Sequence, residues 1–191
     1  MGKGHAGNPD SVRKGREETR GQGAVEHDED TAIVGAADQP AIGLAQTQPG
    51  NPLAILRAAW GFTVETATQG IRFVLSGVFD AYPGLKIILG HMGEGLPFYL
   101  WRISHGLRGS MSERSFRDIF CEHFWITTSG FFSDPALLCC MMEMGIDRVL
   151  FSVDYPFAEN LPGTEWTKTL PLCAEDKEKL LSGNAKRLLK L

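Results

Sequence analysis

The stretch Leu85-Lys86-Ile87-Ile88-Leu89-Gly90-His91-Met92-Gly93-Glu94 decides how this chain folds. Its first five residues form a short apolar run, which is typical of a strand buried on both faces of a parallel sheet. A glycine ends the run, and an imidazole and a carboxylate follow closely. Because α/β folds build their sites at the carboxyl ends of strands, His91 and Glu94 are candidates for chemistry.

Two further strands are predicted downstream, at residues 124–128, which are β-branched and aromatic, and at residues 148–152. Between the first two strands, apolar residues at helical spacing share one face of a predicted helix: Leu96, Leu100, Ile103 and Leu107. Another helix is predicted at residues 136–144. Strands that alternate with helices indicate βα units of a parallel sheet, so the fold class is α/β. We expect residues 124–128 to lie between the other two strands, which places His91 and Asp154 on one rim.

Helices are also predicted at both ends of this region. Apolar residues recur at helical spacing from Leu53 to Val78, and Gly61 and Gly70 are expected to break this stripe. After the third strand, two helices are predicted around residues 174–181 and from Asn184, separated by a glycine.

The overall composition excludes several classes of protein. Nineteen Lys and Arg against 23 Asp and Glu give a net charge of −4, which argues against a nucleic-acid partner. No apolar stretch approaches the ~20 residues of a membrane span, and no apolar segment of a secretory signal opens the chain. Four Cys without C-x-x-C spacing fit reduced thiols, so we expect a cytoplasmic protein.

Composition changes sharply near residue 50. All 18 aromatic residues lie at Trp60 or later, whereas residues 1–50 carry 13 charges and 9 of the 22 Gly. Such a segment buries little against an ordering entropy of roughly 1–2 kcal/mol per residue. We therefore expect residues 1–50 to be a disordered leader and residues 51–191 to form the folded domain.

Chemistry is expected first from His91 and Glu94. A carboxylate three residues after an imidazole can orient the ring and raise its basicity, as in a general acid/base histidine. We expect Glu94 in the first turn of the next helix, where the dipole favours negative charge. The structural alternative is a helix-capping Glu beside an incidental His.

A second candidate is Asp154, which follows the third strand and can ligate a divalent metal or move a proton. Its structural alternative is an Asx turn before Pro156. Arg102 could bind a substrate carboxylate or lie solvated on a helix. The Cys121-Glu122-His123 triplet and the Cys139-Cys140-Met141-Met142 run are interpreted as structural.

Several stretches together resemble one family, the amidohydrolase-related metal-dependent decarboxylases, which include γ-resorcylate and 2,3-dihydroxybenzoate decarboxylases. The stretches run in family order over about two thirds of the chain. Besides the opening stretch, continued by Gly95-Leu96-Pro97, they are Val64-Glu65-Thr66-Ala67-Thr68, Ser76-Gly77-Val78-Phe79-Asp80, Trp101-Arg102-Ile103, Trp125-Ile126-Thr127-Thr128-Ser129-Gly130, Leu150-Phe151-Ser152-Val153-Asp154-Tyr155-Pro156-Phe157 and Gly183-Asn184-Ala185-Lys186-Arg187-Leu188.

This resemblance implies a (β/α)8 TIM barrel with one divalent metal, Zn, Mn or Mg, at its C-terminal face. It implies that Asp154 is a metal ligand and proton carrier, and that His91 is a catalytic histidine partnered by Glu94. Arg102 and Phe157 are implied to line the pocket of a small aromatic carboxylic acid. The implied reaction is the non-oxidative decarboxylation of a hydroxybenzoate.

The chain also departs from the family pattern. The Glu-x-His of the first strand and the His after the fifth cannot be placed, and Gln69 stands where a His is often found. A complete barrel takes about 250 residues, so we expect a partial, truncated barrel behind an unrelated leader. Alternative functions are a non-catalytic remnant or a hydrolase of the same superfamily. We expect the isolated chain to bind Zn²⁺ or Mn²⁺ poorly and to be inactive, and its unclosed sheet edges to favour association between copies.

Overall fold

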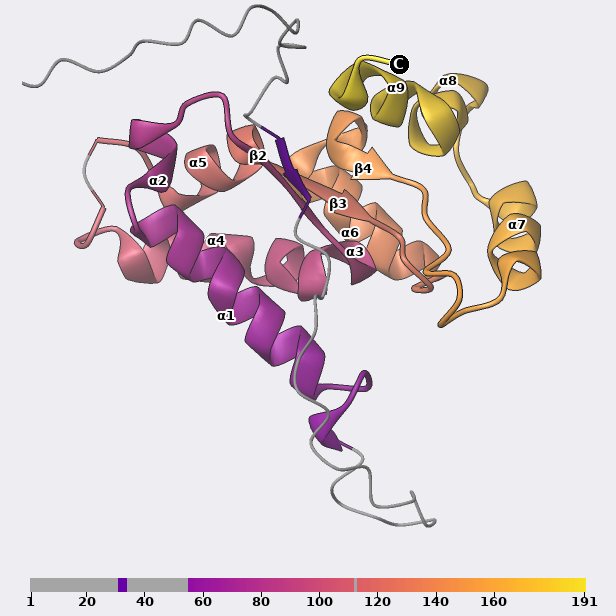
Figure 1. Ribbon diagram of the computed structural model, residues 1–191, viewed down its shortest axis with the longest axis horizontal. Coiled ribbons are helices and arrows are strands. Elements are labelled where there is room, and N and C mark those ends of the chain that lie inside the picture. Colours follow the sequence, from indigo (N-terminus) through magenta and orange to yellow (C-terminus); the bar gives the residue numbers. More distant parts are fainter. Residues whose placement is uncertain (1–30, 34–54, 112) are drawn as a thin grey trace, which may run out of the picture.

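A four-stranded parallel sheet forms the centre of the protein (Figure 1). The computed structural model describes residues 31–33, 55–111 and 113–191. The strands are β1 (Thr31–Ile33), β2 (Lys86–Leu89), β3 (Phe124–Thr127) and β4 (Val149–Leu150), in the spatial order β1-β2-β3-β4. The three strands predicted downstream of residue 80 are confirmed, and β3 lies between β2 and β4 as expected.

Strand β1 comes from the segment that was expected to be a leader. Residues 1–50 were expected to be disordered, yet Ala32 pairs with Ile87 in a parallel ladder. The composition of residues 1–50 does not predict this pairing. A short strand can be held by hydrogen bonds to the unpaired backbone groups at the edge of β2, which do not depend on apolar side chains. Residues 31–33 are therefore part of the sheet. The other positions of the leader lie outside the described residues, and the expectation of a mostly disordered leader stays a prediction.

One face of the sheet is fully buried where β2 and β3 run side by side. Ile87, Leu89, Phe124 and Ile126 are all buried, and Leu89 pairs with Ile126. Because side chains alternate between the two faces of a strand, these four all point to one face. The other face carries Ile88 and the half-buried Trp125, so the burial on both faces that was expected of β2 is complete on one face only.

Helices surround the sheet and follow its strands along the chain (Figure 1). They are α1 (Gly61–Leu75), α2 (Val78–Ala81), α4 (Leu96–Leu107), α5 (Phe116–His123), α6 (Asp134–Met144), α7 (Asn160–Thr169), α8 (Ala174–Glu178) and α9 (Asn184–Leu189). A 3₁₀ turn, Ile146–Arg148, leads into β4, and a one-turn α3 (His91–Glu94) follows β2.

Two predicted helix breaks are wrong. Helix α1 continues through Gly70, which is buried where a Cβ would lie 3.0 Å from Cδ1 of Leu96, so this glycine allows close packing of α4. Near the C-terminus, a π-helical turn, Lys179–Gly183, joins α8 to α9, and Gly183 has helical φ and ψ.

An aromatic row joins α5 to β3 within the core. Phe116, Phe120 and Phe124 stack in sequence, with ring centroids 5.9 and 4.5 Å apart. Phe79 meets Phe124 edge-on and stacks on the ring of His123. His123 is buried, and its Nδ1 donates to the carbonyl of Leu85 at 2.9 Å, which confirms the structural interpretation of this histidine.

The apolar stripe of α1 is only partly used for packing. Val74 is buried, whereas Val64 and Trp60 are exposed. Figure 1 shows the reason, because the first half of α1 extends past the sheet. Similarly, Cys140 of α6 is buried but Met142 is exposed, so only part of that apolar run belongs to the core. Among the described residues, no helix has the length and apolar composition needed to cross a bilayer.

Candidate active site

The ends of β2 and β4 bring an imidazole between two carboxylates. Nδ1 of His91 donates to Oε1 of Glu94 at 2.6 Å, and Nε2 of His91 lies 3.5 Å from Oδ2 of Asp154. Glu94 is almost fully buried, while His91 and Asp154 each keep about a third of their side chain exposed. The expected convergence of His91 and Asp154 on one rim is confirmed, with Glu94 behind the ring.

The backbone reaches this geometry by a left-handed turn. Glu94 was expected in the first turn of a right-handed helix, but the φ angles of residues 91–95 are 47°, 54°, 71°, 55° and 76°, and α4 begins only at Leu96. The turn folds Glu94 back onto the imidazole. The expectation based on the helix dipole is therefore wrong, and the His91 ring itself satisfies this buried carboxylate.

Backbone strain is concentrated at this rim. Six non-glycine residues among those that the structure describes have positive φ, and five of them are at the ends of β2, β3 and β4: His91, Met92, Glu94, Ser129 and Asp154. Each costs of order 1–3 kcal/mol and persists only where the surroundings over-determine it. Such clusters are typical of functional sites.

Hydroxyl groups tie the ends of β3 and β4 together. Oγ1 of Thr128 donates to the carbonyl of Ser152 at 2.5 Å and accepts from its N–H at 2.9 Å. Ser129, whose Oγ is 3.4 Å from that of Ser152, also lies against Gly90, where a Cβ would be 3.7 Å away. These contacts fix the segment that leads into Asp154. Sequence reasoning missed these residues, although hydroxyls at the ends of two adjacent strands are a readable signal.

The two carboxylates change the acidity of the imidazole. The hydrogen bond to Glu94 raises the pKa of His91 above its usual value near 6.5, partial burial opposes this, and the charges of Glu94 and Asp154 raise the pKa further. The protonated imidazolium is therefore favoured at this rim. A ring held at Nδ1 and open at Nε2 can store a proton and pass it to a neighbouring group.

Two expected site residues lie outside the cluster that His91, Glu94 and Asp154 form. Arg102 is exposed on α4 and makes no hydrogen bond or ion pair with the described residues, and Phe157 is 89% exposed beyond Asp154. Within the described part of the chain, no group of three His, Cys, Asp or Glu is arranged to hold a metal ion. Asp154 and His91 alone are fewer than the three protein ligands of a typical catalytic zinc site.

Comparison with known proteins places this chain in a family. A model of the amidohydrolase family matches residues 5–191. The chain belongs to the amidohydrolase family. The matched range includes most of the segment before residue 50, which was expected to be a disordered or unrelated leader. Strand β1 lies within the matched range.

Relatives of this amidohydrolase chain include decarboxylases. It is 42% identical over 145 residues to the γ-resorcylate decarboxylase of Polaromonas sp. (strain JS666), covering 72% of this chain and 44% of that protein. The crystal structure of a dihydroxybenzoic acid decarboxylase from Polaromonas sp. JS666, with bound manganese and 2-nitroresorcinol, is 41% identical. It has a TM-score of 0.69, over 73% of this chain and 44% of that one. A 2,6-dihydroxybenzoate decarboxylase complexed with 2,6-dihydroxybenzoate is also 41% identical, with a TM-score of 0.69 over 74% and 45%.

These matches share one limit of coverage. The chain spans less than half the length of the decarboxylases it matches.

Proposed function

We propose that this chain carries the proton-transfer part of a metal-dependent, non-oxidative decarboxylase of hydroxybenzoates. The observation that carries the proposal is the His91 imidazole between buried Glu94 and Asp154 at the carboxyl ends of β2 and β4. The decarboxylases to which the chain is about 41–42% identical add the reaction class and the kind of substrate, a small aromatic carboxylic acid.

In this reaction the bond between the ring and its carboxylate breaks, CO₂ leaves, and the ring carbon receives a proton. Glu94 accepts from Nδ1, so it orients the imidazole and favours its protonated form. Nε2 and the adjacent Asp154 carboxylate then hold the proton that is delivered to the ring carbon. Partial burial weakens competition from water around the pair.

Asp154 is also the proposed metal ligand of this chain. The structures of related decarboxylases with bound manganese support a divalent metal, which would polarise the substrate's oxygens when bound. The described residues do not complete a three-ligand site, because only Asp154 and His91 are at the rim. No step above therefore depends on the metal.

The proposal also assigns the fold to part of a barrel and gives two further residues a role in substrate binding. The four parallel strands form part of a (β/α)8 barrel, an architecture in which catalytic groups lie at the C-terminal ends of the strands. Arg102 would bind the substrate's carboxylate and Phe157 would cover its ring. Their exposure leaves both side chains accessible for these roles.

A chimera tests the proposal. Residues 55–191 replace the matching part of the Polaromonas γ-resorcylate decarboxylase, and consumption of 2,6-dihydroxybenzoate is followed by absorbance with Mn²⁺ present. We expect an active chimera whose activity falls at least about a hundredfold in His91→Asn and in Asp154→Asn, the usual size of a general acid/base contribution. The chain alone is expected to stay at the background rate.

The matched control is His105→Asn, which changes an exposed histidine of α4. This variant should keep the activity of the parent chimera. A chimera that folds and binds Mn²⁺ but leaves 2,6-dihydroxybenzoate unchanged would overturn the proposal. So would a His91→Asn variant with full activity.

A further inference from the structure

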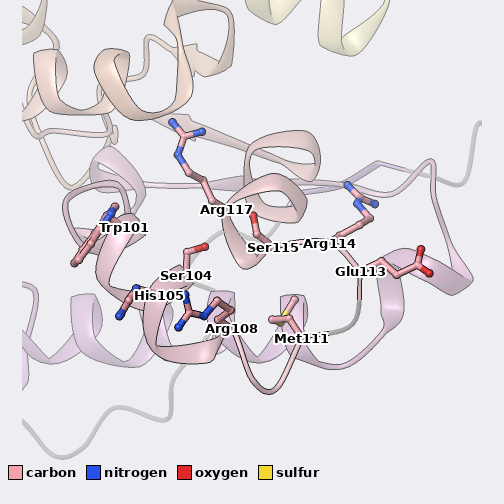
Figure 2. A pocket seen from close by; sticks show the side chains of 9 residues that line it. All are labelled: Trp101, Ser104, His105, Arg108, Met111, Glu113, Arg114, Ser115 and Arg117. Carbon is pink, nitrogen blue, oxygen red and sulfur yellow. The ribbon is translucent and has the colours of Figure 1, made fainter.

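A second concave site lies away from the His91 rim, between the end of α4 and the start of α5. It is a cavity of about 330 Å³ lined by nine residues, none of which belongs to the candidate active site (Figure 2). This volume is within the ~300–1,000 Å³ typical of small-molecule pockets. Because α4 rises 1.5 Å per residue, His105 is ~14 Å along the helix from Leu96, which follows the left-handed turn.

One wall of the cavity is aromatic. The rings of Trp101 and His105, one helical turn apart on α4, stack with centroids 5.1 Å apart and planes at 7°. Trp101 is 70% exposed, so most of a large apolar ring has no cover among the described residues. Figure 2 shows the two rings side by side at one end of the cavity, with Met111 farther along the wall. A planar ring can stack on such a surface.

The rest of the wall is mainly cationic. Arg108, Arg114 and Arg117 line the cavity, against the single carboxylate of Glu113. Arg114 is ion-paired with Glu122, and Arg117 lies 3.5 Å from a carboxylate oxygen of Glu143. Neither of these partner carboxylates is among the lining residues, so they neutralise the two guanidinium groups from outside the cavity.

Arg108 differs from the other two arginines. It follows the last residue of α4, is exposed, and makes no hydrogen bond or ion pair with the described part of the chain. Figure 2 places it close to Ser104 and His105, at the cavity. A single uncompensated guanidinium matches a single carboxylate, to which it can donate two hydrogen bonds. The hydroxyl of Ser104 offers a further donor at the same wall.

We propose that this cavity binds a small aromatic carboxylate, with its ring stacked on Trp101 and its carboxylate on Arg108. The site is separate from the candidate active site and does not depend on the proposed decarboxylase activity. A phosphate dianion fits less well, because Arg114 and Arg117 already have carboxylate partners and the aromatic wall would be unused.

The test is a titration of the full chain with sodium benzoate, followed by NMR of the Trp101 indole N–H, which is assigned by its loss in Trp101→Phe. We expect a saturable shift. Arg108→Gln should weaken binding at least about tenfold, the loss of one charge-assisted pair of hydrogen bonds. The matched control Arg72→Gln, an exposed arginine at the end of α1, should bind benzoate like the parent.

Other ligands and one further variant make the outcome unambiguous. Cyclohexanecarboxylate has the same charge without a planar ring and should bind several-fold more weakly, as should inorganic phosphate. His91→Asn should leave the Trp101 shift unchanged, which separates this site from the active site. The proposal is overturned if the shift does not saturate by roughly 10 mM benzoate, which would mean a Kd well above about 1 mM. It is also overturned if Arg108→Gln binds normally or if His91→Asn abolishes the shift.

Discussion

Replacing Gly93 by alanine should disrupt the left-handed turn that positions His91 and Glu94. Gly93 has φ +71°, and a Cβ built there would lie 2.8 Å from Cγ2 of Ile126 and 3.2 Å from Cδ of Pro97. Ile126 is buried in β3 and cannot move without disturbing the sheet. Gly95 is a matched control, because its φ is +76° and nothing lies within 4 Å of the position that a Cβ would take there.

The expected magnitudes follow from these two environments. An alanine in the left-handed region costs roughly 1–2 kcal/mol, and this cost is common to both variants. Gly93→Ala adds the overlap with Ile126, for which overpacking in a core costs typically about 1–3 kcal/mol. We therefore expect Gly95→Ala to lose about 1–2 kcal/mol and Gly93→Ala about 2–5 kcal/mol. Both changes stiffen the unfolded chain alike, so this effect cancels in the comparison.

Urea unfolding measures the difference. With a slope of about 2 kcal/mol per M, the midpoint of Gly93→Ala should lie about 0.5–1.5 M below that of Gly95→Ala. An NMR titration should also show the pKa of His91 moving back toward 6.5 in Gly93→Ala, since the turn no longer holds Glu94 on the ring. Equal midpoints for the two variants would refute the steric argument.

Three more outcomes are expected. Glu94→Gln should lower the pKa of His91 in an NMR titration, and an unchanged pKa would contradict the assignment. Because the pKa of His91 is raised in the folded protein, the His91–Glu94 pair stabilises the fold fully below about pH 6.5. This stabilisation is lost as the pH rises through the pKa of the folded protein. Asn184→Ala removes the amide that donates to the backbone carbonyls of Ile146 and Val149, at 2.7 and 2.8 Å. The free energy of unfolding, measured in urea, should fall by about 2–4 kcal/mol. A loss under about 0.5 kcal/mol would show that water replaces the amide. Iodoacetamide should modify the exposed Cys173 first and Cys140 last, as followed by mass spectrometry. The reason is that burial raises the pKa of the Cys140 thiol to about 12. Early labelling of Cys140 would mean that α6 opens.

Much of the candidate site could be read from the sequence because it depends on local patterns and on chain order. An apolar run ending in Gly90-His91, and another ending in Asp154, placed both side chains at strand ends. The expected order of the strands then placed them on one rim, and the structure confirms this with a 3.5 Å approach. The roles of Arg102 and Phe157 came from resemblance alone and stay predictions.

Other features depended on contacts between distant parts of the chain. Gly70 predicts a helix break by propensity, but packing against Leu96 keeps the helix continuous, since tertiary contact outweighs a cost of about 1 kcal/mol. Strand β1 comes from a segment with little to bury, because its pairing depends on a free edge of β2. Neither outcome can be read from residues near in sequence.

The sequence by itself therefore determined the α/β class, the three downstream strands and the residues that carry the candidate chemistry, because periodicity and strand ends are local properties. Only the tertiary structure decided the left-handed turn at residues 91–95 and the Thr128–Ser152 contacts that fix the approach to Asp154. The physical reason is that the sign of φ at His91 and Glu94 is set by burial of the Glu94 carboxylate against the imidazole and by the fit of Gly93 against Ile126. Those contacts exist only once β2 and β3 lie side by side.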